Sequence, residues 1–310
     1  MREFIGYENI ISNFERRNYN KTLSHAYLIS GQNGSGKSIL AEKLAKLMID
    51  AREDREYIDI MHYKSSKSSF GVDDVRNIIE EIQKKPYEND KKVVIIHEGD
   101  KLTIQAQNAL LKTIEEPPNG VHIILLCENL ELILDTIKSR CEIYKLTPLS
   151  KKELSEYIEI YWNNKNEEEK KSAIAFSFGV PGRIDRYFQD NELQSLRYSI
   201  LDLLDGLTKN NIEFVLKKEE EFSSIKNNNI EILDIMFSFI RDILVYKEVD
   251  NDDLIINNDK IKEISELAIN MSFKKLNNMI SNIEEAKRNI KSNVNWNTVL
   301  RLMLMSFMEG

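Results

Sequence analysis

The first 150 residues alternate between short apolar runs and amphipathic stretches. Uninterrupted apolar runs occupy residues 25–30, 93–96 and 121–126, and apolar residues repeat at helical spacing over 39–48, 72–84 and 103–114. Apolar runs without polar breaks predict strands that are buried on both faces, whereas the helical repeats predict amphipathic helices. The resulting order, strand, helix, helix, strand, helix, strand, predicts an α/β fold with a parallel sheet.

Beyond Pro148 the pattern becomes helical throughout. Ser150 opens a Ser-Lys-Lys-Glu sequence, which is typical of a capping box at the start of a helix. Helical patterns then cover residues 151–161, 167–178, 182–188 and 191–207. We therefore expect three domains, namely an α/β domain over residues 1–148, a small helical domain over 149–192 and a larger helical domain over 193–310.

Composition excludes several classes of protein. Of the 310 residues, 42% are hydrophobic and 30% are charged, which excludes disorder along the whole chain. No apolar run approaches the roughly 18 residues of a membrane span, and the first residues lack the apolar stretch of a signal peptide. Cys127 and Cys141 are the only cysteines, too few for a disulfide framework or a four-cysteine zinc site. We expect a cytoplasmic protein with no membrane partner and no zinc.

The charge distribution disfavours tight binding to nucleic acid by the chain alone. The net charge is −8, with 21 Lys and Arg against 23 Asp and Glu over residues 1–148, and 22 against 28 in the rest. Neither part is basic, whereas neutralising a phosphate backbone requires a positive surface.

The most specific motif lies between the first predicted strand and the first predicted helix. It has the form G-x-x-x-x-G-K-S and comprises Gly31, Gln32, Asn33, Gly34, Ser35, Gly36, Lys37 and Ser38. In such a loop the backbone N–H groups surround phosphate, the lysine neutralises it, and the serine hydroxyl is a ligand for Mg²⁺. We expect these residues to bind ATP and Mg²⁺. The alternatives are a chance glycine turn and a loop that binds nucleotide without hydrolysing it.

A second nucleotide element is expected where another strand ends, because acidic residues there hold Mg²⁺ and activate water. The candidate is Ile-Ile-His-Glu-Gly-Asp, in which His97 stands where an intact element has Asp. Glu98 occupies the position of the catalytic base, and Asp100 is the remaining acid nearby. Because imidazole is a poor ligand for Mg²⁺, we expect binding to survive better than hydrolysis. Charged residues that merely solubilise the strand end are the alternative for both acids.

Two further motifs carry a family resemblance. The stretch from Asn108 to Pro118 has the sequence N-A-L-L-K-T-I-E-E-P-P, and Ser139, Arg140 and Cys141 follow it as S-R-C. Together with the phosphate loop they resemble the clamp-loader branch of the AAA+ ATPases. Within that branch the Ile-Gly-Tyr-Glu sequence at residues 5–8, Ser-His-Ala-Tyr-Leu at 24–28 and the degenerate His-Glu pair are similar to the delta-prime group of bacterial DNA polymerase III.

The resemblance implies roles for two arginines. Arg140 would act as an arginine finger on the ATP of a neighbouring subunit, whereas a structural ion pair is the alternative. Arg183, in Gly-Val-Pro-Gly-Arg, would reach the phosphates of its own subunit's nucleotide, although this sequence also explains a simple helix start. The three domains would then be an AAA+ domain, a lid and a collar.

The resemblance also implies partners. These would be the gamma/tau and delta subunits in a ring of five, the sliding clamp, and primed DNA through the complex. The chain departs from the family in two places. Glu128 is unusual for a residue facing phosphate, which weakens the case for hydrolysis. The four zinc-binding cysteines of many relatives are absent, so we expect no zinc. The alternatives are an autonomous gamma/tau-like ATPase, which His97 opposes, and a small-molecule enzyme with a phosphate loop.

Overall fold

The computed structural model describes residues 5–53, 55–65, 69–209, 211–225, 229–249 and 254–309. The chain forms two compact units. Unit 1 comprises Met1–Tyr161 and Gly179–Gly182, and unit 2 comprises Trp162–Phe178 and Arg183–Gly310. The division into three domains that we predicted from the sequence stays a prediction.

Unit 1 is built on a five-stranded parallel sheet. Its strands are β1 (Ala26–Ser30), β2 (Ile60–Tyr63), β3 (Lys92–Ile96), β4 (Val121–Cys127) and β5 (Glu142–Lys145), in the order β2-β3-β4-β1-β5. Every pairing is parallel, so all strands end at the same edge. The three strands predicted from apolar runs, β1, β3 and β4, are buried along their whole length. The predicted α/β class is confirmed.

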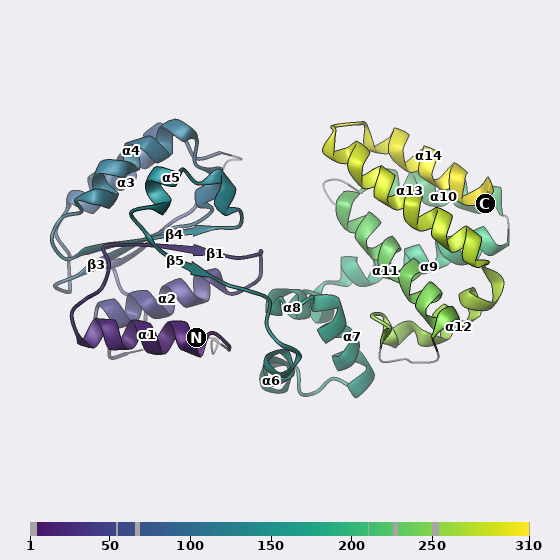
Figure 1. Ribbon diagram of the computed structural model, residues 1–310, viewed down its shortest axis with the longest axis horizontal. Helices are drawn as coiled ribbons and strands as arrows, with labels where there is room; N and C mark the ends of the chain where they lie inside the picture. Colours follow the sequence, from purple (N-terminus) through teal and green to yellow (C-terminus); the bar gives the residue numbers. More distant parts are fainter. Residues whose placement is uncertain are drawn as a thin grey trace. The chain divides into compact units, whose positions relative to one another are not determined.

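Helices cover both faces of this sheet (Figure 1). One face carries α1 (Glu8–Tyr19) and α2 (Lys37–Met48), and the other carries α3 (Val72–Gln83), α4 (Ile104–Glu115) and α5 (Asp135–Lys138). Each face has its own apolar core, because alternate residues of a strand point to opposite sides. The short turns η1 (Gly99–Lys101) and η2 (Leu130–Leu132) follow β3 and β4, and α6 (Lys151–Tyr161) follows β5.

The helices α1 and α5 and the strands β2 and β5 were not predicted from the sequence, so the predicted order of elements was incomplete. Strands β2 and β5 have four residues each and lie at the two edges of the sheet, where only part of each strand is buried. Such short, half-exposed strands lack the apolar run that marks a central strand. The capping box at the start of α6 is confirmed, because Ser150 and Glu153 each accept a hydrogen bond from the other's backbone N–H.

Unit 2 contains only helices in its described residues, as predicted. They are α7 (Glu167–Ser177), α8 (Pro181–Gln189), whose first two residues belong to unit 1, α9 (Asn191–Thr208), α10 (Ile212–Ser224), α11 (Asn229–Glu248), η4 (Asn258–Lys260), α12 (Ile261–Asn270), α13 (Phe273–Lys291) and α14 (Trp296–Glu309). One apolar core joins α9 to α14. No helix in the described part of the chain has the length and apolarity that crossing a bilayer requires.

Apolar residues at helical spacing on α11 and α14 lie in the core of unit 2, with one exception on α14. Ile235, Phe239, Leu300 and Leu304 are buried, whereas the side chain of Leu302 is 63% exposed. Leu302 lies two residues from both buried leucines of α14, and residues two apart point to different faces of a helix. Leu302 therefore lies outside the core of unit 2.

Candidate nucleotide-binding site

The phosphate-loop motif connects β1 to α2, so the strand, loop and helix predicted around it are present. Gly34 and Gly36 have φ angles of 80° and 92°, a left-handed conformation that glycine adopts without strain. The ammonium of Lys37 donates hydrogen bonds to the carbonyl oxygens of Gly31 and Gln32, at 2.7 and 2.9 Å. Lys37 thus folds back over the loop, and an anion bound there would compete for its N–H groups.

A second glycine segment packs directly against this loop. The backbone N–H of Gly182 donates to the carbonyl oxygen of Gly34 at 3.0 Å. A β-carbon built on Gly182 would lie 2.7 Å from the Cα of Gly34, closer than two such carbons approach. This contact requires glycine at position 182. It also gives Gly-Val-Pro-Gly a packing role that a simple helix start would not need.

The end of β3 brings three predicted residues beside the loop. Nδ1 of His97 lies 3.4 Å from the Ser38 hydroxyl. The carboxylate of Glu98 pairs with Lys101 through Oε1 at 3.0 Å. Asp100 accepts hydrogen bonds through one oxygen from the backbone N–H groups of residues 128 and 129, at 3.1 and 3.2 Å. Asp100 therefore fastens the end of β4, which is a structural task that sequence analysis did not foresee.

Two buried polar atoms of this region accept or donate no hydrogen bond within the described residues. They are Oγ of Ser35, in the loop, and Oε2 of Glu98. A buried polar atom without a partner costs about 1–3 kcal/mol, so each would gain from a polar ligand or water. Burial lowers the pKa of Lys37, although the charges of Glu128 and Asp100 act in the opposite direction. The residues present thus fit a phosphate-bearing ligand with its cation.

Arg140 has a partner within its own chain. Its guanidinium forms an ion pair with Glu115, at the end of α4, and donates to the carbonyl oxygen of Thr136 at 2.8 Å. The two family motifs, S-R-C and N-A-L-L-K-T-I-E-E-P-P, therefore meet through a single salt bridge. The Arg140 side chain remains 39% exposed. A structural ion pair is one of the alternatives predicted for Arg140, but its partner Glu115 lies 25 residues earlier and was not predicted.

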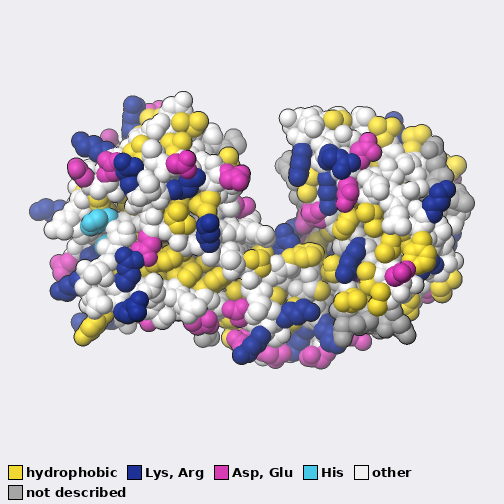
Figure 2. Space-filling view, viewed as in Figure 1, with side chains coloured by type: hydrophobic (Ala, Val, Ile, Leu, Met, Phe, Trp, Pro, Cys, Tyr) yellow, Lys and Arg dark blue, Asp and Glu magenta, His cyan; other side chains and the backbone are white. Residues whose placement is uncertain are grey.

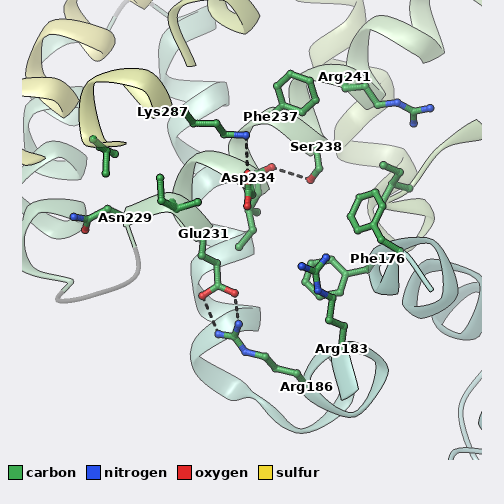
Figure 3. A pocket seen from close by; sticks show the side chains of 15 residues that line it. Phe176, Arg183, Arg186, Asn229, Glu231, Asp234, Phe237, Ser238, Arg241 and Lys287 are labelled. Carbon is green, nitrogen blue, oxygen red and sulfur yellow. Dashed lines mark hydrogen bonds and ion pairs between the residues drawn. The ribbon is translucent and has the colours of Figure 1, made fainter. Parts of the chain in front are cut away.

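Arg183 lies in unit 2, where it lines a pocket of about 1010 Å³ (Figure 3). Its guanidinium lies 5.8 Å from the centre of the Phe178 ring. Arg186, on the same helix, makes a two-pronged ion pair with Glu231, and Lys287 pairs with Asp234 at 2.6 Å. The approach of Arg183 to phosphates stays a prediction.

Cys127 and Cys141 are free thiols, and burial raises the pKa of each to about 12, so both are unreactive at neutral pH. Basic and acidic side chains are interspersed on the described surface of each unit that Figure 2 presents, without a continuous basic patch on that face.

Two families of replication proteins match the sequence. The family described as DNA polymerase III, delta subunit matches residues 6–150, and its C-terminal counterpart matches residues 201–307. The delta-prime subunit of DNA polymerase III from Bacillus subtilis is 25% identical over 306 residues, covering 93% of this chain and 92% of that protein. The chain belongs to the delta-prime family of DNA polymerase III subunits.

Proteins of the gamma and tau type are also similar to this chain, over half of it in sequence and over most of it in fold. The tau/gamma subunit of DNA polymerase III from Haemophilus influenzae is 31% identical over 172 residues, which cover 50% of this chain and 25% of that protein. A gamma subunit-related protein of Thermotoga maritima shares the fold, with a TM-score of 0.57 and 17% identity over 96% of this chain and 98% of its own.

Proposed function

We propose that this delta-prime family member is a ring subunit of a clamp loader, which binds ATP and Mg²⁺ but hydrolyses ATP weakly or not at all by itself. One observation carries this proposal. A complete phosphate loop, with Lys37 and Ser38 in place, stands beside a strand end where His97 replaces the acidic residue. Binding depends on the loop, whereas hydrolysis also needs the cation and water to be placed by carboxylates.

Arg140 is proposed to act on the nucleotide of a neighbouring subunit. The ion pair with Glu115 supports this role, because it holds the guanidinium near the surface while leaving it 39% exposed. An exposed ion pair is worth about 0–1 kcal/mol, so exchanging Glu115 for a more highly charged partner costs little. An arginine supplied in trans can raise turnover by about 10³–10⁵.

The proposed partners are the gamma/tau and delta subunits, with the sliding clamp and primed DNA as the substrates of the assembled ring. Exposed apolar side chains on unit 2 support association through its helices. Leu302 and Met305 on α14 are 63% and 55% exposed, and Ile212 and Leu216 on α10 are 60% and 53% exposed. Apolar side chains gathered on two helices are typical of a surface that another protein covers.

The test measures ATP binding and hydrolysis by the purified chain, alone and with the gamma/tau and delta subunits. We expect binding that Lys37→Ala abolishes, with little turnover by the chain alone. On assembly, Arg140→Ala should lower the ATPase rate of the ring at least tenfold. Arg76→Ala is the matched control, because Arg76 also pairs with a carboxylate but lies 69% exposed on α3. Equal rates for the two arginine variants would contradict the finger.

An autonomous ATPase of the gamma/tau kind is the second candidate. The 31% identity to a tau/gamma subunit over 172 residues favours it. His97 opposes it, because imidazole is a poor substitute for a carboxylate near Mg²⁺. Rapid, Lys37-dependent turnover by the chain alone would favour this candidate over the ring subunit.

A further inference from the structure

Four side chains make three successive contacts beside the phosphate loop. Ser38 and Glu42 lie four residues apart on α2 and therefore share one face of that helix. The Ser38 hydroxyl lies 3.4 Å from Nδ1 of His97. Nε2 of His97 lies 3.1 Å from Nδ1 of His62, on β2, and Nε2 of His62 lies 3.0 Å from the Glu42 carboxylate.

The Glu42 carboxylate fixes the direction of each of these three hydrogen bonds. An ionised carboxylate only accepts, so the hydrogen between Glu42 and His62 belongs to Nε2 of His62. Neutral His62 then has a bare Nδ1, which accepts the N–H of Nε2 from His97. Neutral His97 in turn has a bare Nδ1, which accepts the hydroxyl hydrogen of Ser38. Each ring nitrogen has one defined role.

We propose that Glu42 and His62 are positioning residues that hold His97 with a bare Nδ1, so that His97 replaces the missing carboxylate as the hydrogen-bond acceptor of Ser38. The lone pairs of the Ser38 hydroxyl then remain free for Mg²⁺. This inference rests on the proposed binding of nucleotide and Mg²⁺ at the loop. It assigns functions to His62 and Glu42, to which no motif pointed.

The geometry of these contacts favours the neutral His97 ring, because Nε2 has an acceptor in His62 and Nδ1 faces the Ser38 hydroxyl. His97 is partly buried and His62 is exposed, and the centres of the two rings lie 5.4 Å apart. A neutral imidazole with a bare nitrogen toward Ser38 offers the same acceptor as a carboxylate but no charge, so we expect Mg²⁺ to bind more weakly than it would beside a carboxylate.

The first test compares the affinity of a fluorescent ADP analogue with Mg²⁺ and with EDTA. We expect His62→Phe to reduce the enhancement by Mg²⁺ about tenfold, which is typical when a residue that orients a metal ligand is lost. The Mg²⁺-free affinity should not change. His25→Phe is the matched control, because His25 lies before β1, at the opposite end of the strand from the loop. In a His97→Asp background the effect of His62→Phe should disappear, because the acceptor no longer depends on His62.

The second test needs no nucleotide. Nitrogen-15 NMR of the histidine rings should show a bare Nδ1 and a protonated Nε2 at His97, and His62→Phe should remove the hydrogen-bond signature of that Nε2. A His97 that carries its proton on Nδ1, or a Mg²⁺ enhancement that His62→Phe leaves unchanged, would overturn the inference while the proposed function stands. If the parent chain binds nucleotide no better than Lys37→Ala does, the proposed function is overturned, and this inference with it.

Discussion

Unit 2 contains a buried ion pair whose removal should have a large and measurable cost. Arg197, on α9, is fully buried, and its guanidinium donates to both oxygens of Asp259, at 3.0 and 2.8 Å. Two neutral oxygens, on Gln194 and Asn257, accept its other hydrogen bonds. The backbone N–H of Asp259 donates to the Ser172 hydroxyl on α7 at 2.8 Å, so this pair joins three segments of unit 2.

The perturbation is Asp259→Ala, which leaves the Arg197 charge buried with neutral acceptors only. Breaking a buried pair by removing one partner costs about 3–5 kcal/mol. With a denaturant slope of about 2 kcal/mol per molar urea, the midpoint of unfolding should fall by about 2 M. The matched control is Asp205→Ala, because Asp205 and Lys209 are 52% and 68% exposed and such a pair is worth about 0–1 kcal/mol.

Tryptophan fluorescence is a selective assay for this prediction. The chain has two tryptophans, Trp162 and Trp296, and both lie in unit 2. Urea unfolding followed by fluorescence therefore reports this unit without a contribution from unit 1. If Asp259→Ala destabilises unit 2 by no more than Asp205→Ala, the reasoning that a desolvated Arg197 depends on one carboxylate is refuted.

The same pair predicts a dependence on pH. Burial by itself would raise the pKa of Asp259, but the hydrogen bonds and charge of Arg197 outweigh it and hold this pKa below its usual range. A depressed carboxyl pKa contributes stability that is present above the unfolded value of about 3.9 and is lost as pH falls through the folded value. The difference in free energy of unfolding between the parent and Asp259→Ala should be constant above about pH 5 and should shrink below pH 4. A difference that persists undiminished at pH 2.5 would contradict this account.

Three further predictions concern other parts of the chain. Gly182→Ala should destabilise unit 1 by about 1–3 kcal/mol in thermal unfolding and weaken nucleotide binding in titrations, because its β-carbon would press on the backbone of Gly34. Gly71→Ala is the control and should change neither quantity, since the nearest atom to its β-carbon would lie 3.6 Å away. Burial lowers the pKa of His122, so unit 1 should lose stability as pH falls below the unfolded value of about 6.5, and His122→Asn should reduce that loss between pH 7.5 and 5.5 in melts followed by circular dichroism. Leu302→Glu should leave the free energy of unfolding within about 0.5 kcal/mol of the parent value but weaken assembly with partner subunits in sedimentation. A large loss of stability would instead place Leu302 in the core.

Local pattern alone identified much of this protein. The central strands β1, β3 and β4 are apolar runs because both of their faces are covered, and the helices carry apolar residues at a period that needs no knowledge of the fold. The phosphate-loop motif was recognisable because its glycines and its lysine are adjacent in sequence, and the family followed from motifs of the same kind.

Other features depend on the order of strands in the sheet, which no local pattern encodes. The edge strands β2 and β5 are too short and too exposed to show a period. His62 and His97 meet because β2 and β3 are parallel neighbours that end at the same edge, and Glu115 meets Arg140 because α4 and α5 pack on one face. These partners are distant in sequence, and each is an ordinary polar residue in its own segment. Only the tertiary structure decided these contacts, because a hydrogen bond depends on the position of both atoms in space and not on the spacing of residues along the chain.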